Sequence, residues 1–583
     1  MSNPNEQVPL PSSQPSPTTP FNPSILHGPS TPPLVTLTLS KLLDIQCRRY
    51  GPKECLIIPW TGARWTYHKL REESINLAKM LVEVGIRPGD RVGVMAGNCE
   101  QYVAVVFAVA RVGGILVVLN NTYTAGEALR GLRHTSCKIL FTTFKLGKAD
   151  NSALLSKLSR DPNAAPWLEE IIILNGEARE YRTYAEAIET GSNLLEDEIE
   201  ELDSHLGTYE VAMLLFTSGS TGNPKAASLT HHNVINNARF IGDRLALTHT
   251  DILCCPPPLF HCFGLVLGLL ACMTHGASIV YPAEMFDPQE TLLAIAREKC
   301  TALHGVPAMF DSVFSLPREG LDMTSLRTGI IAGAPVPRHL MEMMYDEFGM
   351  REFTSSYGLT EASPTVFNAH THDPVHLKLT TVGTLLPHAH AKIVDKHNRI
   401  VPVGTKGELC IAGYQLQAGY WQNASKTSES MVLDDEGILW LHTGDEAVFD
   451  NNGYCSITGR FKDLIIRGGE NIYPLEIEER LVEHPSIERA VVVGVKHARF
   501  GEVVGAFLQR KEGVERPSDE EIRKWTAQTL GRHKCPAHVF WFGEDGVLAE
   551  VPLTGSGKVQ KFVLRDVAEQ WLYGGGGAAV ARL

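Results

Sequence analysis

Short apolar runs alternate along the chain with longer segments that have the length and composition of helices. The runs that we expect to be strands are 91–95, 138–142, 171–174 and 277–281. Segment 99–112, between the first two runs, is expected to be a helix. Because strands that alternate with helices form largely parallel sheets, this order predicts an α/β fold of packed sheets and helices.

Two longer apolar stretches could be mistaken for membrane spans. Stretch 103–119 is interrupted by Arg111 and by two glycines, and stretch 259–273 carries His261. A membrane helix needs about 18 or more uninterrupted apolar residues, and neither stretch reaches that length. We therefore expect buried helices or strands here, and no membrane span.

Changes in composition divide the 583-residue chain into four parts. Residues 1–34 contain ten prolines and no Lys or Arg, which predicts a flexible tail. Gly, Asn and charged residues become dense near 453–462, and a shorter α+β stretch follows them. The sequence therefore predicts a large domain over 35–460, a small α+β domain over 461–571 and a second flexible tail over 572–583.

The charge and the cysteines narrow the possible functions. The chain has 53 Lys and Arg against 66 Asp and Glu, a net charge of −13, so it lacks the basic character of a dedicated nucleic-acid binder. Its 12 cysteines include no CxxC pair, which indicates reduced thiols inside a cell. We expect no nucleic-acid partner, and any bound phosphate should be held locally.

The C-terminus has the form of a targeting signal. Four glycines precede a short segment that ends in Ala581, Arg582 and Leu583. This small–basic–leucine tripeptide resembles the Ser-Lys-Leu peroxisomal address. We therefore expect recognition by the peroxisomal import receptor and a peroxisomal location; a chance tail would leave the protein in the cytoplasm.

A loop of small hydroxyl residues and glycines is the strongest chemical signal in the chain. It follows the apolar residues 214–216 and consists of Thr217, Ser218, Gly219, Ser220, Thr221, Gly222, Asn223, Pro224 and Lys225. Glycines let backbone amides approach an anion, hydroxyls add donors, and the lysine adds a cation. The spacing does not match GxxxxGK[ST], and segment 554–559 does not match it either. The loop therefore predicts a polyphosphate site of another type.

The order of several further motifs identifies a family. After the loop come Tyr357-Gly358-Leu359-Thr360-Glu361, Thr443-Gly444-Asp445, Gly459-Arg460-Phe461-Lys462-Asp463, Arg467-Gly468-Gly469-Glu470-Asn471-Ile472 and Pro552-Leu553-Thr554-Gly555-Ser556-Gly557-Lys558. In this order the chain resembles the adenylate-forming, AMP-binding superfamily over roughly residues 35–570. Phe260-His261-Cys262 and the segment 331–335 look most like medium-chain acyl-CoA synthetases, including fungal peroxisomal members.

The resemblance implies a reaction and a moving domain. ATP and a carboxylic acid would form an acyl-adenylate and diphosphate, and coenzyme A would then capture the acyl group and release AMP. The small domain of such enzymes is mobile and rotates about a hinge, which matches Lys462 here. Its rotation would bring Gly468, Gly469 and Glu470 to line the channel for coenzyme A.

The resemblance also implies how ATP is held. The loop from Thr217 to Lys225 would bind the β- and γ-phosphates, and Thr217 and Glu361 would bind Mg²⁺, which prefers oxygen ligands. Asp445 would accept hydrogen bonds from the ribose, and Arg460 would contact the ribose or a phosphate. Residues expected around the adenine and the AMP moiety are Gly333, Ala334, Pro335, Ser356, Tyr357, Gly358, Leu359 and Thr360.

Two further sets of residues concern the acid. Lys558 would be the adenylation catalyst, placed between the carboxylate and the α-phosphate. With Lys558, the residues Glu361 and His261 are the expected catalytic residues. The acid pocket would involve His261, Phe263, Gly305 and Gly333, although a histidine among apolar residues is also typical of an ordinary core. The cysteines at 254, 255, 262 and 272 match no zinc pattern, so we expect no metal there.

The identity of the acid stays open at this level. No Arg or Lys lies immediately beside the pocket motifs, which favours a monoacid. A medium-chain aliphatic acid fits the resemblance best, a branched or hydroxylated short acid such as mevalonate is a close rival, and aryl acids are a third class. A stand-alone adenylation enzyme that loads a carrier protein, a luciferase-type monooxygenase and an inactive scaffold are the competing functions.

Overall fold

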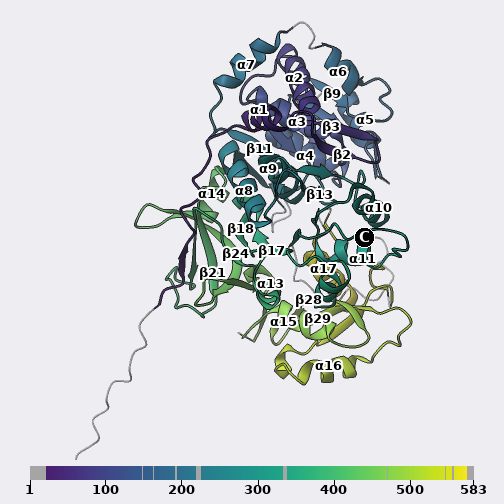
Figure 1. Cartoon of the computed structure of the whole chain (residues 1–583). Helices are drawn as coiled ribbons and strands as arrows, with labels where there is room; N and C mark the ends of the chain where they lie inside the picture. The colour runs from purple at the N-terminus through teal and green to yellow at the C-terminus, as the bar shows by residue number, and fades with distance from the viewer. Residues whose placement is uncertain are drawn as a thin grey trace, which may run out of the picture.

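The structure is a computed structural model (Figure 1). It describes residues 22–147, 149–161, 163–190, 194–217, 225–332, 338–468, 470–544, 546–554 and 557–573. Sheets with helices on their faces make up the upper part of the molecule, and a smaller unit from the C-terminal part of the chain lies at the bottom (Figure 1). The predicted α/β class, with a large N-terminal and a small C-terminal domain, is confirmed.

An eight-stranded sheet carries the phosphate loop. Its strand order is β10-β9-β6-β4-β5-β11-β12-β22. The strands are β4 (Arg91–Met95), β5 (Ile115–Val118), β6 (Ile139–Thr142), β9 (Glu170–Ile173), β10 (Arg182–Thr183), β11 (Val211–Thr217), β12 (Lys225–Thr230) and β22 (Gly419–Tyr420). The strands predicted at 91–95, 138–142 and 171–174 are confirmed, and the helix predicted at 99–112 is α3 (Glu100–Arg111).

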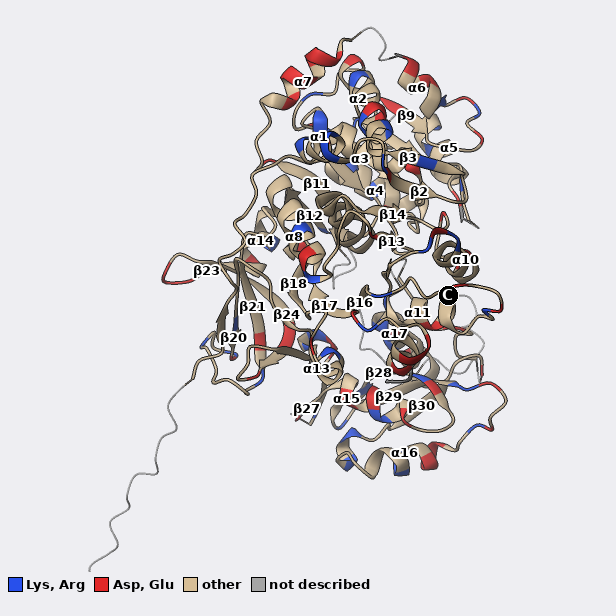
Figure 2. Ribbon diagram, viewed as in Figure 1, with Lys and Arg blue, Asp and Glu red and all other residues tan. Residues whose placement is uncertain are grey.

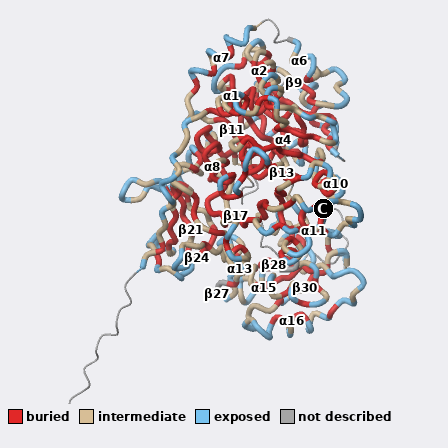
Figure 3. The backbone as a smooth tube through the Cα atoms, in the orientation of Figure 1, coloured by how far each residue is buried: buried red, intermediate tan, exposed pale blue. Residues whose placement is uncertain are grey.

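Strands β4, β5, β6 and β9 of this sheet are largely apolar because both faces of the sheet are covered. Leu116 and Val118 of β5 face the main core, whereas Ile115 and Val117 pack with the opposite layer. Buried positions dominate this part of the chain (Figure 3). The helices of this region are α1 (Leu39–Tyr50), α2 (Tyr67–Glu83), α4 (Ala125–Thr135), α5 (Ser152–Arg160), α6 (Tyr184–Thr190), α7 (Glu196–Ser204) and α8 (His231–Arg244).

A second, five-stranded sheet has the order β15-β13-β14-β2-β3. Its strands are β2 (Glu54–Ile58), β3 (Ala63–Thr66), β13 (Ile252–Cys254), β14 (Ser278–Val280) and β15 (Ala302–Leu303). The strand predicted at 277–281 is β14. The apolar stretch before it forms the buried helical segments η2 (Phe263–Leu270) and α9 (Ala271–His275). Across the described part of the chain, no helix combines the length and the apolar character that a membrane span requires.

Two further sheets of the large domain have four and six strands, and β7 (Lys145–Leu146) and β8 (Ala149–Asp150) form a small two-stranded sheet. The four-stranded sheet contains β16 (Ile330–Ala332), β17 (Thr354–Gly358), β18 (Thr365–Asn368) and β19 (Thr384–Leu385). The six-stranded sheet contains β1 (Ile25–His27), β20 (Ala389–Val394), β21 (Gly407–Gly413), β23 (Met431–Leu433), β24 (Leu439–Phe449) and β25 (Cys455–Arg460). The adjacent helices are α10 (Pro288–Glu298), α11 (Pro307–Phe314), α12 (Arg338–Glu342), η3 (Met343–Glu347), α13 (Val375–Thr380) and α14 (Ala424–Ser430).

The expectation of a flexible N-terminal tail over 1–34 is wrong for residues 22–34. Strand β1 pairs antiparallel with β20, with Ile25 opposite Lys392. The backbone N–H of Gly28 donates to the carbonyl of Ala389 at 2.8 Å. The edge of β20 supplies hydrogen-bond partners that the composition of the segment could not reveal. Residues 1–21 lie outside the described part of the chain.

The small domain begins where the chain leaves β25 at Arg460. A short 3₁₀ turn, η5 (Phe461–Asp463), leads into β26 (Ile465–Arg467), β27 (Glu470–Ile472), β28 (Ile487–His497), β29 (Gly501–Arg510) and β30 (His538–Trp541). Its helices are α15 (Pro474–Val482), α16 (Asp519–Ala527) and α17 (Lys561–Tyr573). The last helix therefore extends two residues into the predicted flexible tail over 572–583; residues 574–583, including the predicted targeting tripeptide, lie outside the described part.

Candidate active site

The two ends of the predicted phosphate loop lie next to each other in the sheet. Thr217 ends β11, Lys225 begins β12, and the two residues are direct cross-strand partners. The hairpin thus closes the loop at the end of the central sheet, where open α/β sheets commonly bind ligands. The loop residues between them, Ser218, Gly219, Ser220, Thr221, Gly222, Asn223 and Pro224, lie outside the described part of the chain.

The predicted ribose-binding carboxylate is held by two other predicted residues. Asp445 is only 3% exposed. Its Oδ2 accepts a hydrogen bond from the Tyr357 hydroxyl at 2.6 Å, and its Oδ1 lies 2.8 Å from Nε of Arg460. Burial and the adjacent carboxylate raise the pKa of Tyr357 well above its usual value, so the phenol remains a neutral donor. Three side chains from β17, β24 and β25 therefore form one oriented cluster.

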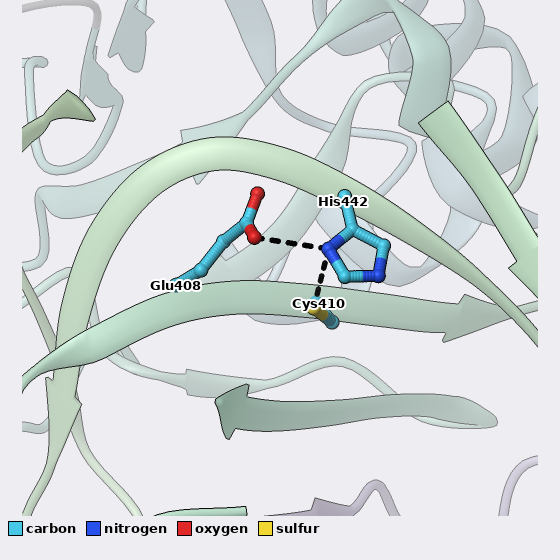
Figure 4. Close-up of side chains that lie close together, drawn as sticks. All are labelled: Glu408, Cys410 and His442. Atoms are coloured by element: carbon cyan, nitrogen blue, oxygen red, sulfur yellow. Dashed lines mark hydrogen bonds and ion pairs between the residues drawn. The ribbon is translucent and has the colours of Figure 1, made fainter. Parts of the chain in front are cut away.

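A further set of contacts orients the part of β24 that carries Asp445. Three of the side chains in this set, Glu408, Cys410 and His442, lie close together (Figure 4). Oε1 of Glu408 accepts the backbone N–H of Gly444 at 3.2 Å, and its Oε2 lies 2.9 Å from Nδ1 of His442. Sγ of Cys410 lies 3.4 Å from the same nitrogen. Gly444 has φ +71°, a left-handed conformation that favours glycine. Glu408, Cys410 and His442 also have the donor types of a metal site, but their contacts with one another and with Gly444 of β24 explain the arrangement.

Glu361 lies beside an aromatic residue that the sequence did not single out. It belongs to the short 3₁₀ turn η4 (Thr360–Ala362), and its Oε1 accepts a hydrogen bond from the Tyr420 hydroxyl at 2.8 Å. Nζ of Lys225 lies 4.8 Å from the centroid of the Tyr420 ring, a cation–π contact. Tyr420 thus connects the predicted phosphate lysine with the predicted Mg²⁺ ligand. A tyrosine after a glycine is too common a pattern to have predicted this role.

His261 lies two residues before η2. Its backbone N–H donates to the carbonyl of Pro258 at 3.1 Å, and its Nδ1 accepts the N–H of Phe263 at 3.1 Å. Burial, with a smaller effect from the Lys558 cation, lowers the pKa of His261 to about 3. The ring is therefore neutral at physiological pH. Burial also raises the pKa of the neighbouring Cys262 thiol to about 12, so it is not a thiolate.

Lys558 reaches this cluster from the small domain. Its side chain is accessible to solvent, but the protein around it reduces its hydration and lowers its pKa. The Arg460 cation lowers that pKa further, whereas the nearby Asp445, Cys262 and Glu361 raise it. The large domain thus places two carboxyl groups and a guanidinium around the lysine of the small domain.

The loop that carries Lys558 is tightly formed. The carbonyl of Lys558 accepts the N–H of Thr554 at 2.7 Å, and the N–H of Gly557 donates to the carbonyl of Thr554 at 2.8 Å. Gly557 has φ +81°, and a Cβ built on it would lie 3.1 Å from Cγ2 of Val306 in the large domain. A glycine here therefore suits both the turn and the close approach of the two domains. Gly555 and Ser556 lie outside the described residues.

The predicted hinge and channel residues belong to the first part of the small domain. Lys462 lies in η5, and its carbonyl accepts a hydrogen bond from Nη2 of Arg565 at 3.2 Å. Gly468, with φ +59°, turns the β26–β27 hairpin. The exposed Glu470 lies 3.5 Å from Nε2 of His533 in its own domain. Gly469 lies outside the described residues.

The residues around the predicted acid pocket are closely packed. A Cβ built on Gly305 would lie 3.1 Å from the ring of Phe310. Phe263, Val306 and Met309 share one buried cluster. The pocket residue Gly333 lies outside the described part, as do Ala334 and Pro335. Ser356 and Gly358 flank Tyr357 on β17, and Leu359 and Thr360 follow them toward Glu361.

A buried histidine that the sequence did not single out lies behind this pocket. Nδ1 of His304 accepts the N–H of Ile330 at 3.2 Å, and its Nε2 lies 3.1 Å from the carbonyl of Leu267. These two partners specify the tautomer with hydrogen on Nε2. Burial lowers the pKa of His304 to about 4, because removal from water disfavours the charged imidazolium. His304 is thus a neutral structural residue.

Family models match both domains of this arrangement. Residues 43–421 match the model of the AMP-binding enzyme, and residues 476–558 match that of the AMP-binding enzyme C-terminal domain. The chain belongs to the AMP-binding enzyme family. Both halves of the site come from matched regions, since Thr217, Lys225 and Glu361 lie in the first and Lys558 ends the second.

Relatives that match nearly the whole chain show which activity within the family it has. The chain is 61% identical to "Acyl-CoA ligase sidI" of Beauveria bassiana (strain ARSEF 2860), over 94% of this chain and 95% of that protein. It is 58% identical to "Acyl-CoA ligase sidI" of Aspergillus fumigatus, over 94% and 93%. It is 35% identical to "Medium-chain acyl-CoA ligase ACSF2, mitochondrial" of Danio rerio, over 94% and 91%. The chain is thus an ATP-dependent, AMP-forming acyl-CoA ligase that acts through an acyl-adenylate.

Solved structures agree with the fold. ATP-bound MatB from Rhodopseudomonas palustris has a TM-score of 0.79 at 26% identity, covering 92% of this chain and 100% of that one. The anthranilate CoA ligase AuaEII in complex with anthranoyl-AMP has a TM-score of 0.80 at 23% identity, covering 92% and 98%. Because AuaEII is only 23% identical, the comparison with it shows the shared fold alone.

Proposed function

We propose that the ligase activates a short, branched or hydroxylated aliphatic monocarboxylic acid with MgATP and transfers it to coenzyme A. The observation that carries the assignment of roles is the position of Lys558. It comes from the small domain and lies among Asp445, Glu361 and Arg460 of the large domain. A cation introduced by a separate domain can act in one half-reaction and leave for the other.

The residues around Lys558 have the chemistry needed to bind the phosphates, the ribose and the adenine of ATP. Lys225 and the loop that it ends would hold the β- and γ-phosphates, and Asp445 would accept from the ribose hydroxyls. Arg460 would contact the ribose or a phosphate, and Tyr357 would form one wall for adenine. The Glu361 carboxylate and the Thr217 hydroxyl offer the oxygen donors that Mg²⁺ prefers. Held by these two side chains, Mg²⁺ would supply positive charge that offsets the negative charge of ATP.

The first half-reaction forms a mixed anhydride. An oxygen of the acid attacks the α-phosphorus, a new O–P bond forms, and diphosphate leaves with the electrons of the broken P–O bond. Lys558 would lie beside the carboxylate and the α-phosphate, where negative charge increases in the transition state. His261, neutral because its pKa is about 3, adds no positive charge there.

The second half-reaction replaces AMP by sulfur. The thiol of coenzyme A releases its proton to solvent, its sulfur forms a bond to the acyl carbon, and the bond from that carbon to the phosphate oxygen breaks as AMP leaves. Lys558 must withdraw to admit the thiol, and rotation about Lys462 would replace it by Gly468, Gly469 and Glu470. The expected hinge lies where η5 joins the two sheets, which supports this assignment.

The packing around Gly305 supports the proposed size of the acid. Phe310 is 1% exposed and Val306 is 6% exposed, so large side chains occupy the space beside the glycine. Segments 259–267 and 302–310 contain no Lys or Arg that could pair with a second carboxylate. The chain is also far more similar to the sidI ligases than to the medium-chain ligase of Danio rerio. These observations favour a short monoacid over an unbranched medium-chain acid.

A panel of acids assayed with and without coenzyme A tests this proposal. Mevalonate, isovalerate, octanoate and benzoate would each be supplied with MgATP, and AMP release and diphosphate–ATP exchange would be measured. We expect exchange without coenzyme A and rapid AMP release with it, strongest for the short branched or hydroxylated acids. A preference for octanoate would refute the size argument. AMP release that requires an acyl carrier protein would refute coenzyme A as acceptor.

The cellular location is a separate part of the proposal. The terminal Ala581, Arg582 and Leu583, which follow a run of four glycines in the sequence, would be recognised by the peroxisomal import receptor. A fluorescent protein fused in front of the last twelve residues, 572–583, should enter peroxisomes, and the same fusion without the last three residues should stay outside. Equal distributions of the two fusions would refute the signal.

A further inference from the structure

We propose that Tyr473 is a positioning residue that holds the small domain in the orientation required for adenylation, through its contact with Glu446 of the large domain. Tyr473 follows β27 and directly precedes α15. Its hydroxyl donates to Oε1 of Glu446 at 2.5 Å. Glu446 is on β24 and is the neighbour of Asp445. The inference rests on the proposed function, since it assigns Lys558 to the first half-reaction.

Contacts within the large domain orient Glu446 to accept a hydrogen bond from the Tyr473 hydroxyl. It is 4% exposed, and its second oxygen, Oε2, accepts a hydrogen bond from the Thr458 hydroxyl. Nζ of Lys406 lies 4.0 Å from that oxygen. A buried carboxylate with these partners has a specified orientation, and its first oxygen is directed at Tyr473. The large domain therefore presents a prepared site for one hydroxyl of the small domain.

The ring of Tyr473 is held as well as its hydroxyl. Nζ of Lys406 lies 4.8 Å from the ring centroid. A Cβ built on Gly459 would lie 3.2 Å from Cδ1 of Tyr473, so glycine lets the ring lie against β25. Burial and the Glu446 carboxylate raise the pKa of Tyr473, which keeps the phenol protonated and able to donate. Lys406, Gly459 and Glu446 together form a docking site for one aromatic side chain.

The position of Tyr473 connects this docking site to the domain orientation, which determines which half-reaction can occur. The orientation that brings its hydroxyl to Glu446 is also the one that brings Lys558 to Asp445 and Glu361. Tyr473 lies only three residues after Glu470 of the predicted channel segment. A rotation that carries this segment into the site must move Tyr473 away from Glu446. The contact thus stabilises the first orientation and must break before thioester formation.

The substitution Tyr473→Phe tests the proposal with little change in shape. It removes the hydroxyl and keeps the ring beside Lys406. A hydrogen bond to a carboxylate contributes enough to shift a two-state equilibrium by about 10-fold or more. We therefore expect diphosphate–ATP exchange to fall about 10-fold, while thioester formation from supplied acyl-adenylate and coenzyme A stays equal or rises. Equal loss in both half-reactions, or no loss in either, would overturn the proposal.

A matched control and a partner substitution separate positioning from folding. Tyr454 also donates to a carboxylate, Asp373 at 2.8 Å, but both residues belong to the large domain. Tyr454→Phe should leave the ratio of the two half-reactions unchanged. Glu446→Gln should reproduce the effect of Tyr473→Phe, and the double substitution should add little to either one. Additive effects in the double variant would contradict the contact as their common cause.

The orientation can also be measured without turnover. Eleven of the twelve cysteines are buried, so introduced surface cysteines can carry spin labels. Lys524 on α16 and Arg399, in the connection between β20 and β21, are exposed. Helix α16 and strands β20 and β21 lie in different parts of the molecule (Figures 1 and 2). Tyr473→Phe should broaden the distance distribution between labels at K524C and R399C. A failure of the proposed function would appear as no acyl-adenylate with any acid in the unsubstituted enzyme, whereas an unchanged distribution would refute the role of Tyr473 alone.

Discussion

Removing the amino group of Lys558 should damage one half-reaction and spare the other. An ammonium and a phosphate oxygen about 4 Å apart interact by about 4 kcal/mol at an effective dielectric constant of 20. Removal of one group that is positioned to stabilise the negative charge of a transition state commonly raises the activation free energy by about 3–4 kcal/mol. This corresponds to a roughly thousandfold lower rate. Lys558 is contributed by the small domain and lies near Arg460, Asp445 and Glu361 of the large domain, so its removal takes away the positive charge that the small domain brings to this cluster.

We therefore expect Lys558→Ala to lower the rate of acyl-adenylate formation by about a thousandfold. Diphosphate–ATP exchange would measure this step, and thioester formation from supplied acyl-adenylate would measure the other, which should change by less than about threefold. Lys561→Ala is the matched control, because Lys561 pairs with Glu478 of its own domain at 2.7 Å. An equal fall in both half-reactions of the Lys558 variant would refute the proposed role.

Three further expectations concern the hinge, the phosphate end and the core. Lys462→Pro should preserve diphosphate exchange and impair thioester formation; normal thioester turnover would contradict the hinge. Tyr420→Phe should raise KM for MgATP about 10-fold through loss of the hydroxyl that orients Glu361, and an unchanged KM over a Mg²⁺ titration would count against that contact. His304 has a folded pKa of about 4, below its unfolded value, so unfolded protein binds more protons as the pH falls. Its contribution to the free energy of unfolding should drop by about 2 kcal/mol from pH 7 to pH 5, and His304→Gln should reduce the pH dependence seen in urea unfolding by that amount.

The sequence alone determined the fold class, the family and the residue types of the reaction. Strands such as 91–95 are continuous apolar runs because both faces of a parallel sheet are buried, so local composition suffices to locate them. The phosphate loop and the motifs around Glu361, Asp445 and Lys558 are contiguous in the chain. Their residue types follow from local chemical requirements, namely amides and hydroxyls for phosphate and oxygens for Mg²⁺.

Only the tertiary structure decided which residues that are distant in the sequence contact one another. Tyr420 contacts Glu361 across 59 positions of sequence, and Tyr473 meets Glu446 across the domain boundary. The order of residues 22–34 likewise depends on the edge of β20, which lies more than 350 positions away. Partners of this kind are chosen by strand register and domain orientation, which depend on packing over the whole molecule. A tyrosine or a proline-rich segment has the same local sequence whether or not such a partner exists, and for that reason no reading of the chain alone could have found them.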